Sequence, residues 1–360
     1  MQQAKRRQHY VWQSYLKAWV FDNTKNKIWS SHEGRVGEKY TSQLVWKDFF
    51  YELKPINQEE REFFQLLFLR KCSQDVQERF ISLIDNHNEL FRKKSEWDLM
   101  CSFISVLGGE SRLPQELQEE YRRHKRMSAE IDIAIKNTRE NYHSEIETEA
   151  SKWLCSLKRR NLDFFSTDEL LIIEEGYSHS EAYRFLLFLC MQYFRTKRRY
   201  TDFKKGIEKN LKNPEMISCL SDCRIDAENV KSAHVIPWLI RLQEEELANY
   251  LLVTKASLVL LVNNTDLPFI TSDQPVVNLR ADYQSQAKNI LETVFYYPIS
   301  PCLAVIVNEP TLSDAIELCR EQVELYNQKI ASASYQHLFS NDRATLEAYI
   351  NPQEAQPCKF

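Results

Sequence analysis

Apolar residues change their spacing twice along the chain, near residue 57 and again near residue 250. Over residues 58–91 they recur every three to four positions, which predicts one long amphipathic helix or two in series. Further helices are predicted at 96–107, 114–157, 167–175, 180–199 and 226–249, with a stop at Gly108 and Gly109 and a break near 141–142. The middle of the chain is therefore expected to be helical.

Short apolar runs at the two ends of the chain predict strands. Residues 20–29 are expected to form a hairpin with a polar tip at 22–26, and residues 45–53 a further extended piece. Strands are also predicted at 257–262, 269–271, 276–278, 294–297, 303–307 and 337–339, with a helix at 313–333. Because a lone hairpin is marginally stable, we expect the N-terminal hairpin to pair with the C-terminal strands.

These patterns predict a predominantly helical α+β fold. Its small antiparallel or mixed sheet would be built from the N-terminal hairpin and the C-terminal strands, around a large helical middle. We expect one domain over residues 1–360, with β-rich ends at 1–55 and 250–340 and a helical insertion at 58–249. Two independent domains are the alternative.

The sequence lacks the common cofactor and metal motifs. It has six glycines and neither a G-x-G-x-x-G nor a G-x-x-x-x-G-K-[ST] phosphate loop, so no organic cofactor is indicated. It also lacks the G-x-S-x-G elbow of α/β-hydrolases. No H-E-x-x-H or D-x-D pattern supports a divalent metal, which stays open, and Cys219, Cys223 and His234 fall short of a four-ligand zinc pattern. The cofactor is therefore unknown.

Charge and hydropathy limit the partners and the location. A net charge of −4 predicts no general attraction to nucleic acid, so such a partner would need a local basic patch. The basic run at residues 197–199 is expected to be a solvated face. The N-terminus has no apolar signal segment, and the most apolar stretch, at 183–194, is too short to cross a bilayer. We expect a soluble, cytoplasmic protein without a membrane partner, and its oligomeric state is open.

Four stretches of sequence together resemble a known bacterial family. They read HYVWQSYLKAW at 9–19, FLCMQYFRTKRR at 188–199, PFITSDQPVV at 268–277 and YYPISPCLAVIV at 296–307, and LYNQKIASAS at 325–334 matches less strictly. In this order they are similar to the family called domain of unknown function 4238. Trp12 and Lys197 stand where the family pattern has prolines. Without a proline at 197, the helix is expected to run on through Arg199.

Polar residues in the first two stretches are candidates for a site. His9 titrates near neutrality and could act as an acid or base, or it could bond to a backbone carbonyl beside the core. Tyr10 follows it. Arg195 ends an apolar helix, where a cation suits the helix dipole, but it could also bind a carboxylate or phosphate through two parallel bonds. Gln192 and Thr196 lie on the same helix face.

The third stretch places Ser272 and Asp273 at the exit of a predicted strand, where binding and catalytic groups often gather. Asp273 could form an Asx-turn by accepting amide bonds from residues 274–276. It could instead orient His9, pair with Arg195 or contribute to a metal site. The distances between these side chains decide among the alternatives.

Three hypotheses of function follow. In the first, the protein is a phosphodiester hydrolase, a nuclease-type effector in anti-phage defence or a toxin-like system, with His9, Asp273 and Arg195 as catalytic residues. Gln192, Thr196, Ser272 and Tyr10 would then bind the substrate. The patchy bacterial occurrence of the resembling family motivates the defence role. The alternative is a non-catalytic module that binds a ligand or a partner, nucleic acid or protein, through a basic patch or the charged helical middle. In the third, the motifs only staple the two chain ends together.

Overall fold

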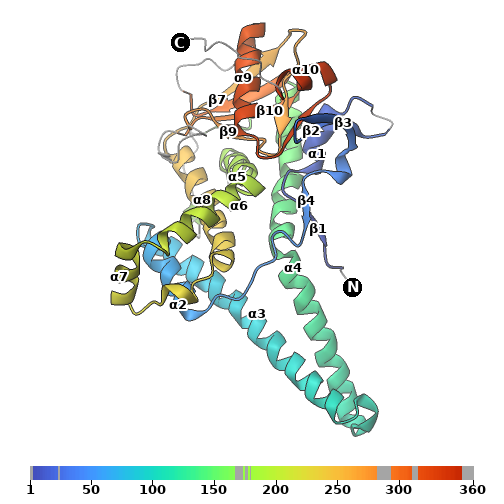
Figure 1. Ribbon diagram of the computed structural model, residues 1–360, viewed down its shortest axis with the longest axis vertical. Coiled ribbons are helices and arrows are strands. Elements are labelled where there is room, and N and C mark those ends of the chain that lie inside the picture. The colour runs from blue at the N-terminus through green and yellow to red at the C-terminus, as the bar shows by residue number, and fades with distance from the viewer. Residues whose placement is uncertain are drawn as a thin grey trace. The chain divides into compact units, whose positions relative to one another are not determined.

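The structure is a computed structural model that describes residues 3–22, 25–166, 173–174, 177–178, 180–281, 293–309 and 315–350 (Figure 1). By its internal contacts the chain forms two compact units. Unit 1 consists of Met1–Gln8, Asp48–Ser144 and Phe203–Leu242, and unit 2 of His9–Lys47, Glu145–Asp202 and Gln243–Phe360. The predicted α+β class with a predominance of helix is confirmed. The single-domain organisation stays a prediction.

Helices make up most of unit 1. They are α2 (Gln58–Phe64), the π-helical turn η3 (Gln65–Leu69), α3 (Gln74–Val106), the 3-10 turn η4 (Glu110–Arg112), the first part of α4 (Gln115–Lys158), the end of α6 (Lys197–Asn210), α7 (Pro214–Asp222), η5 (Ala227–Asn229) and the start of α8 (Ser232–Val253). Local caps explain where several begin. Asn57 and Glu60 form a capping box at α2, Ser73 caps α3, and Asn213 caps α7 just before a first-turn proline.

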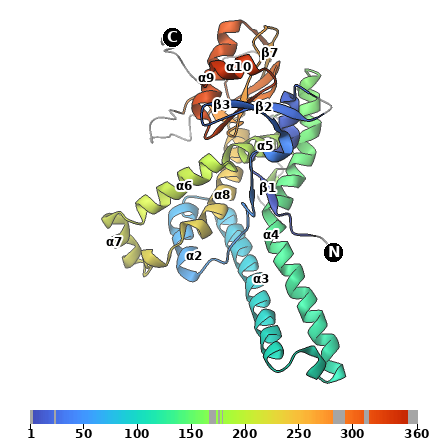
Figure 2. The same ribbon diagram turned by 45° about the vertical axis from the view of Figure 1, so that its right-hand side comes forward.

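Two long helices correct the predicted boundaries (Figure 2). Helix α3 runs unbroken for 33 residues, so the separate helix predicted at 96–107 is its last part. Helix α4 runs for 44 residues without the break predicted near 141–142. Neither helix contains the glycine or proline that would interrupt it. The stop after α3 is confirmed, because Gly108 and Gly109 have φ angles of 106° and 82°.

The two larger sheets among the described residues lie in unit 2. One has the strand order β12-β7-β11-β10-β9, from β7 (Leu258–Asn263), β9 (Val277–Asn278), β10 (Phe295–Ser300), β11 (Leu303–Val307) and β12 (Ala315–Leu318). It is mixed, because β12 pairs parallel to β7 whereas the other pairs are antiparallel. The other sheet has the order β3-β2-β13-β8, from β2 (Lys27–His32), β3 (Arg35–Tyr40), β8 (Thr271–Ser272) and β13 (His337–Ser340). Strand β13 pairs with β2, which confirms that the two chain ends share a sheet.

The remaining elements are short or lie beside the sheets. They are β1 (Arg7–His9) paired with β4 (Trp46–Asp48), β5 (Ile173–Glu174) paired with β6 (Tyr177–Ser178), α1 (Gln13–Leu16), η1 (Lys17–Trp19), η2 (Thr41–Gln43), α5 (Glu181–Phe194), α9 (Arg320–Ala333) and α10 (Arg343–Ala348). The helix predicted at 167–175 lies mostly outside the described residues, and its described part, β5, is strand.

The hairpin predicted at residues 20–29 is present as a short antiparallel bridge between Asp22 and Lys27, where the N–H of Phe21 donates to the carbonyl of Lys27 at 3.1 Å. The longer N-terminal hairpin is β2–β3, where Glu33 and Gly34 both take positive φ angles (50° and 74°) that suit a tight turn. Two other predictions of local structure are wrong. The helix predicted at 313–333 begins only at Arg320, because residues 315–318 join the sheet as its edge strand β12. The helix expected to continue through Arg199 ends at Phe194, and α6 starts anew at Lys197.

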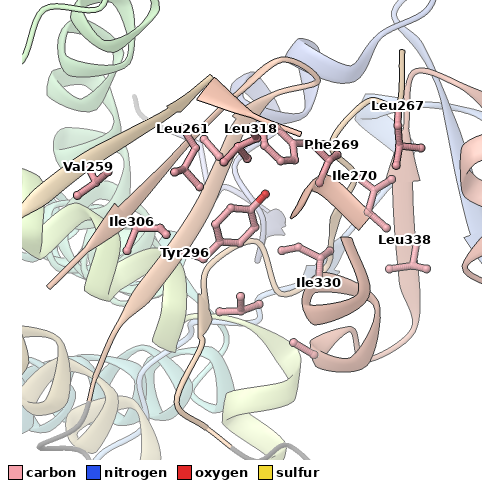
Figure 3. Close-up of a cluster of buried hydrophobic side chains, with 14 of the residues drawn as sticks. Val259, Leu261, Leu267, Phe269, Ile270, Tyr296, Ile306, Leu318, Ile330 and Leu338 are labelled. Carbon is pink, nitrogen blue, oxygen red and sulfur yellow. The ribbon is translucent and has the colours of Figure 1, made fainter. Parts of the chain in front are cut away.

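The core of unit 2 joins the five-stranded sheet to α9 and β13 (Figure 3). Val259 and Ile306 from the sheet, Ile330 from α9 and Leu338 from β13 belong to one buried cluster, with Tyr296 among them. Burial of such side chains contributes about 1.5–3 kcal/mol each.

Candidate functional site

Arg195 is a fully buried cation at the end of α5. Its Nη1 lies 2.5 Å from Oε1 of Glu147, and its Nη2 donates a hydrogen bond of 2.7 Å to the backbone carbonyl of His9. The structure therefore brings Arg195 and His9 together, but through the main chain of His9. The positive charge of Arg195 is neutralised inside unit 2 by Glu147, a partner that the sequence did not reveal.

Asp273 is buried as well, and its carboxylate receives three backbone N–H groups. The N–H groups of Tyr335 and Gln336 donate at 2.8 Å each, and that of His337 at 3.2 Å. Among the described residues, the Asp273 carboxylate forms its hydrogen bonds with these amides rather than with His9 or Arg195. Asp273 thus holds the turn that connects α9 to β13.

Ser272 makes the local turn that was considered for Asp273. Its hydroxyl accepts a hydrogen bond from the N–H of Gln274 at 3.0 Å and donates to the carbonyl of the same residue at 2.9 Å. A serine hydroxyl can replace an aspartate in such a turn. The Asx-turn interpretation is therefore wrong for Asp273, whose carboxylate reaches a segment more than sixty residues away.

Burial raises the pKa of Asp273 from its usual value of 3.8 to about 6, although the three amides favour the charged form. Because the pKa of Asp273 is higher in the folded protein than in the unfolded chain, the protonated carboxyl favours the folded state. This contribution is fully present below the unfolded pKa of 3.8 and is lost as the pH rises through the folded pKa of about 6. We expect the unfolding free energy of the wild type, minus that of Asp273→Asn, to fall by on the order of 3 kcal/mol between pH 4 and pH 7. Urea titrations of both proteins at the two pH values measure it. A difference that is constant, or that grows with pH, contradicts this prediction.

Thr196 and Gln274 link the end of α5 to the turn at 272–275. The Thr196 hydroxyl donates to Oε1 of Gln274, and Nε2 of Gln274 donates to the carbonyls of Tyr193 and Val276 at 3.0 Å each. The Thr196 hydroxyl also accepts from the N–H of Arg199. It thereby caps the start of α6, which explains why the helix does not continue from α5.

Gln192 and Tyr10 are buried in unit 2. Neither amide atom of Gln192 has a hydrogen-bond partner among the described residues. Burial, together with the nearby charge of Asp273, raises the pKa of Tyr10, so its hydroxyl stays protonated at neutral pH. Of the candidates proposed from the sequence, Gln192 has its polar atoms least engaged by the protein.

The basic run after Arg195 is not the solvated face that was expected. Nη1 of Arg198 donates to the carbonyls of Ala333 and Ser334 at 2.7 and 3.1 Å, at the C-terminus of α9. The guanidinium of Arg199 is buried and lies 4.0 Å from the ring centre of Tyr193. These cations bind inside unit 2, where a helix C-terminus and an aromatic face attract them.

The motif residues therefore form internal contacts that join the N-terminal segment, α5, the turn at 272–275 and the segment 335–337. Hydrogen bonds within the chain therefore engage many of the polar groups of these motifs. A catalytic role for His9, Arg195 and Asp273, and substrate binding by Gln192, Thr196, Ser272 and Tyr10, stay predictions.

An exposed apolar surface lies on α3 in unit 1. Leu99, Phe103 and Val106 are 72%, 63% and 83% exposed, and Leu107 beside them is 56% exposed. Their spacing of four and three residues places them on one face of the helix. We call Leu99, Phe103, Val106 and Leu107 the α3 stripe. It is a contiguous apolar surface, which on a folded protein often marks an interaction site.

The opposite face of α3 packs against α4. Nζ of Lys94 lies 3.8 Å from the carboxylate of Asp132, the hydroxyl of Ser128 donates to Asp98, and the ring of Trp97 lies 5.7 Å from that of His124. These residues define an antiparallel helical hairpin (Figure 2). The α3 stripe thus faces away from α4. Its spacing was visible in the sequence, but a buried face shows the same spacing, so its exposure could not be predicted.

In the described parts of the chain, no group of three or more His, Cys, Asp or Glu side chains is placed to hold a metal ion. Cys219 and Cys223 are free thiols, and Nδ1 of His234 lies 3.0 Å from the buried carboxylate of Glu60. Among the same residues, no helix has both the length and the apolar character needed to cross a bilayer.

Comparison with known proteins returned one family. A family model described as "Protein of unknown function (DUF4238)" matches residues 7–344, which include every motif described above. Searches of curated proteins and of solved structures gave no significant match.

Proposed function

Because the chain belongs to the protein family DUF4238, whose description assigns no activity, we propose from geometry that it is a non-catalytic binding module. Its α3–α4 hairpin binds a protein partner through the α3 stripe. The observation that carries this proposal is the exposure of Phe103 and its neighbours on the face of α3 that is turned away from α4.

The chemistry of the stripe suits a protein rather than nucleic acid. Residues 99–107 contain no charged side chain, so they offer nothing to a phosphate backbone. Apolar residues at helical spacing are the anchors by which one helix packs against another helix or into a groove. This supports the alternative of a protein-binding helical middle over a basic nucleic-acid patch.

The engagement of the motif residues favours binding over catalysis. A phosphate clamp needs an accessible guanidinium, whereas that of Arg195 is buried against Glu147 and the carbonyl of His9. The carboxylate of Asp273 is likewise occupied by three amides. The nuclease, hydrolase and anti-phage roles stay predictions. A cytoplasmic location belongs to the present proposal, because exposed free thiols such as Cys219 and Cys302 suit a reducing compartment.

Photo-crosslinking at position 103 tests the proposal. We expect a benzophenone amino acid at Phe103 to form a protein adduct in living cells, and Val106→Lys in the same chain to abolish that adduct. The same probe at Ile217, an exposed apolar residue of α7 in the same unit, is the matched control and should not form it. Phe103→Glu should weaken binding at least about 100-fold. The substitution removes an aromatic side chain that the partner would bury, and it places a charge in an apolar contact. Equal adducts at 103 and 217, or none at 103, would sink the proposal.

A further inference from the structure

Two histidine rings are stacked where the two ends of the chain share a sheet. His32 on β2 is the register partner of His337 on β13, and the ring centres lie 4.5 Å apart with 20° between the ring planes. Directly opposite residues of an antiparallel pair project from the same face of a sheet, so the pairing of β2 with β13 holds the rings together. We propose that the two rings form an acid-sensitive joint, at which protonation of both loosens the hairpin β2–β3 from β13.

Protonation turns this stack from a favourable contact into a repulsive one. Histidine is the side chain that ordinarily gains a proton as the pH falls from neutral toward about 5. Two imidazolium ions with ring centres 4.5 Å apart repel each other, and like charges directly opposite each other on paired strands are destabilising. Because each ring is attached to one of the paired strands, the repulsion works against the pairing of β2 with β13.

A hydrogen bond fixes the ring of His337 in place. Its Nδ1 lies 3.1 Å from the backbone carbonyl of Ser31 on β2, which can only accept, so Nδ1 carries a hydrogen and an added proton goes to Nε2. Burial, together with the charges of His32 and Lys197, lowers the pKa of His337, although the carbonyl of Ser31 favours its charged form. His337 therefore cannot turn away from His32 without losing its bond to β2.

His32 is exposed, but the cations beside it limit its escape from His337. Arg35 on β3 is the register partner of His32, so His32 stands between Arg35 and His337 on one face of the sheet. A protonated His32 that turns away from His337 thus approaches a second cation. Lys197, at the start of α6, disfavours a proton on His337 from another side.

The carboxylates near the pair do not offset the added charge. Glu33 follows His32 and is exposed, so water and salt screen it. The buried carboxylate of Asp273 accepts the backbone N–H of His337 at 3.2 Å. The pKa of Asp273 is about 6, so this carboxylate loses its charge over the range in which histidines gain theirs. Both changes make the joint more positive as the pH falls.

Hydrogen exchange of the full-length chain, followed by mass spectrometry and corrected for the intrinsic effect of pH, tests the proposal. Between about pH 7.5 and about pH 5, the protection of β2 and β13 should fall at least about threefold. That of β10 and β11, which contain no histidine, should stay constant. His32→Phe keeps an aromatic ring without a charge and should abolish the fall, whereas His124→Phe on α4 should not. No fall in the wild type, an equal fall in His32→Phe, or an equal fall in β10 and β11 overturns the proposal.

A histidine titration by NMR tests the coupling of the two rings without requiring the strands to separate. In His32→Gln, which keeps a polar but uncharged side chain, the pKa of His337 should be at least about half a unit higher than in the wild type. Unchanged circular dichroism at neutral pH verifies that each variant is folded. A pKa of His337 that is unchanged or lower in His32→Gln would show that the rings do not repel each other's protons, and it would overturn the joint as well.

Discussion

Replacing Arg195 with methionine is expected to lower the free energy of unfolding by about 3–5 kcal/mol. The substitution keeps an apolar stem of similar length but removes the charge that lies 2.5 Å from Glu147. A largely buried carboxylate then loses its counter-ion, and the carbonyl of His9 loses the donor at 2.7 Å. Losing one partner of a buried ion pair costs far more than losing one partner of an exposed pair.

The same two helices provide a matched control. Arg184 on α5 pairs with Glu149 on α4, but with side chains 43% and 28% exposed. Arg184→Met should therefore cost less than about 1 kcal/mol. Urea unfolding followed by circular dichroism compares the two variants directly. Equal losses would contradict the large stabilisation expected from the buried pair of Arg195 and Glu147. An Arg195→Met protein with unchanged stability would favour the phosphate-binding role predicted from the sequence over a structural one.

An Asp273→Ala variant is expected to lose about 2–4 kcal/mol of unfolding free energy at pH 7. Three amides at residues 335–337 lose their acceptor, and relief from burying the carboxylate offsets only part of that loss. Hydrogen exchange at these amides should become faster than in the wild type, because the turn from α9 to β13 is no longer held.

Asp342 provides the control for Asp273. Its carboxylate accepts one amide, from Thr345 at 2.7 Å, at the start of α10, so Asp342→Ala should cost about 1 kcal/mol. A catalytic Asp273 without a structural role would show the reverse pattern, with normal stability and unchanged exchange at 335–337. The stability and hydrogen exchange of Asp273→Ala report the loss of the acceptor for the three amides. The pH dependence of Asp273→Asn reports the free-energy cost of burying the charged carboxylate.

Local pattern determined a large part of the fold. The spacing of apolar residues predicted the helical middle and the strands after residue 250, and the paired glycines at 108 and 109 marked the end of α3. The weakness of a lone hairpin predicted that the two ends of the chain share a sheet, as β2 and β13 do. Each of these features depends on neighbours in sequence or on a general limit to stability, and the family motifs could be read in the same way.

Other features were decided only by tertiary structure, because they depend on which distant groups approach each other. The sequence drew attention to Asp273 and Arg195, but it could not show that one receives amides from residues 335–337 and that the other pairs with Glu147. It showed apolar spacing along the end of α3 but not that α4 packs on the opposite face. Periodicity reports that a helix face is apolar, whereas exposure depends on what the rest of the chain brings against that face.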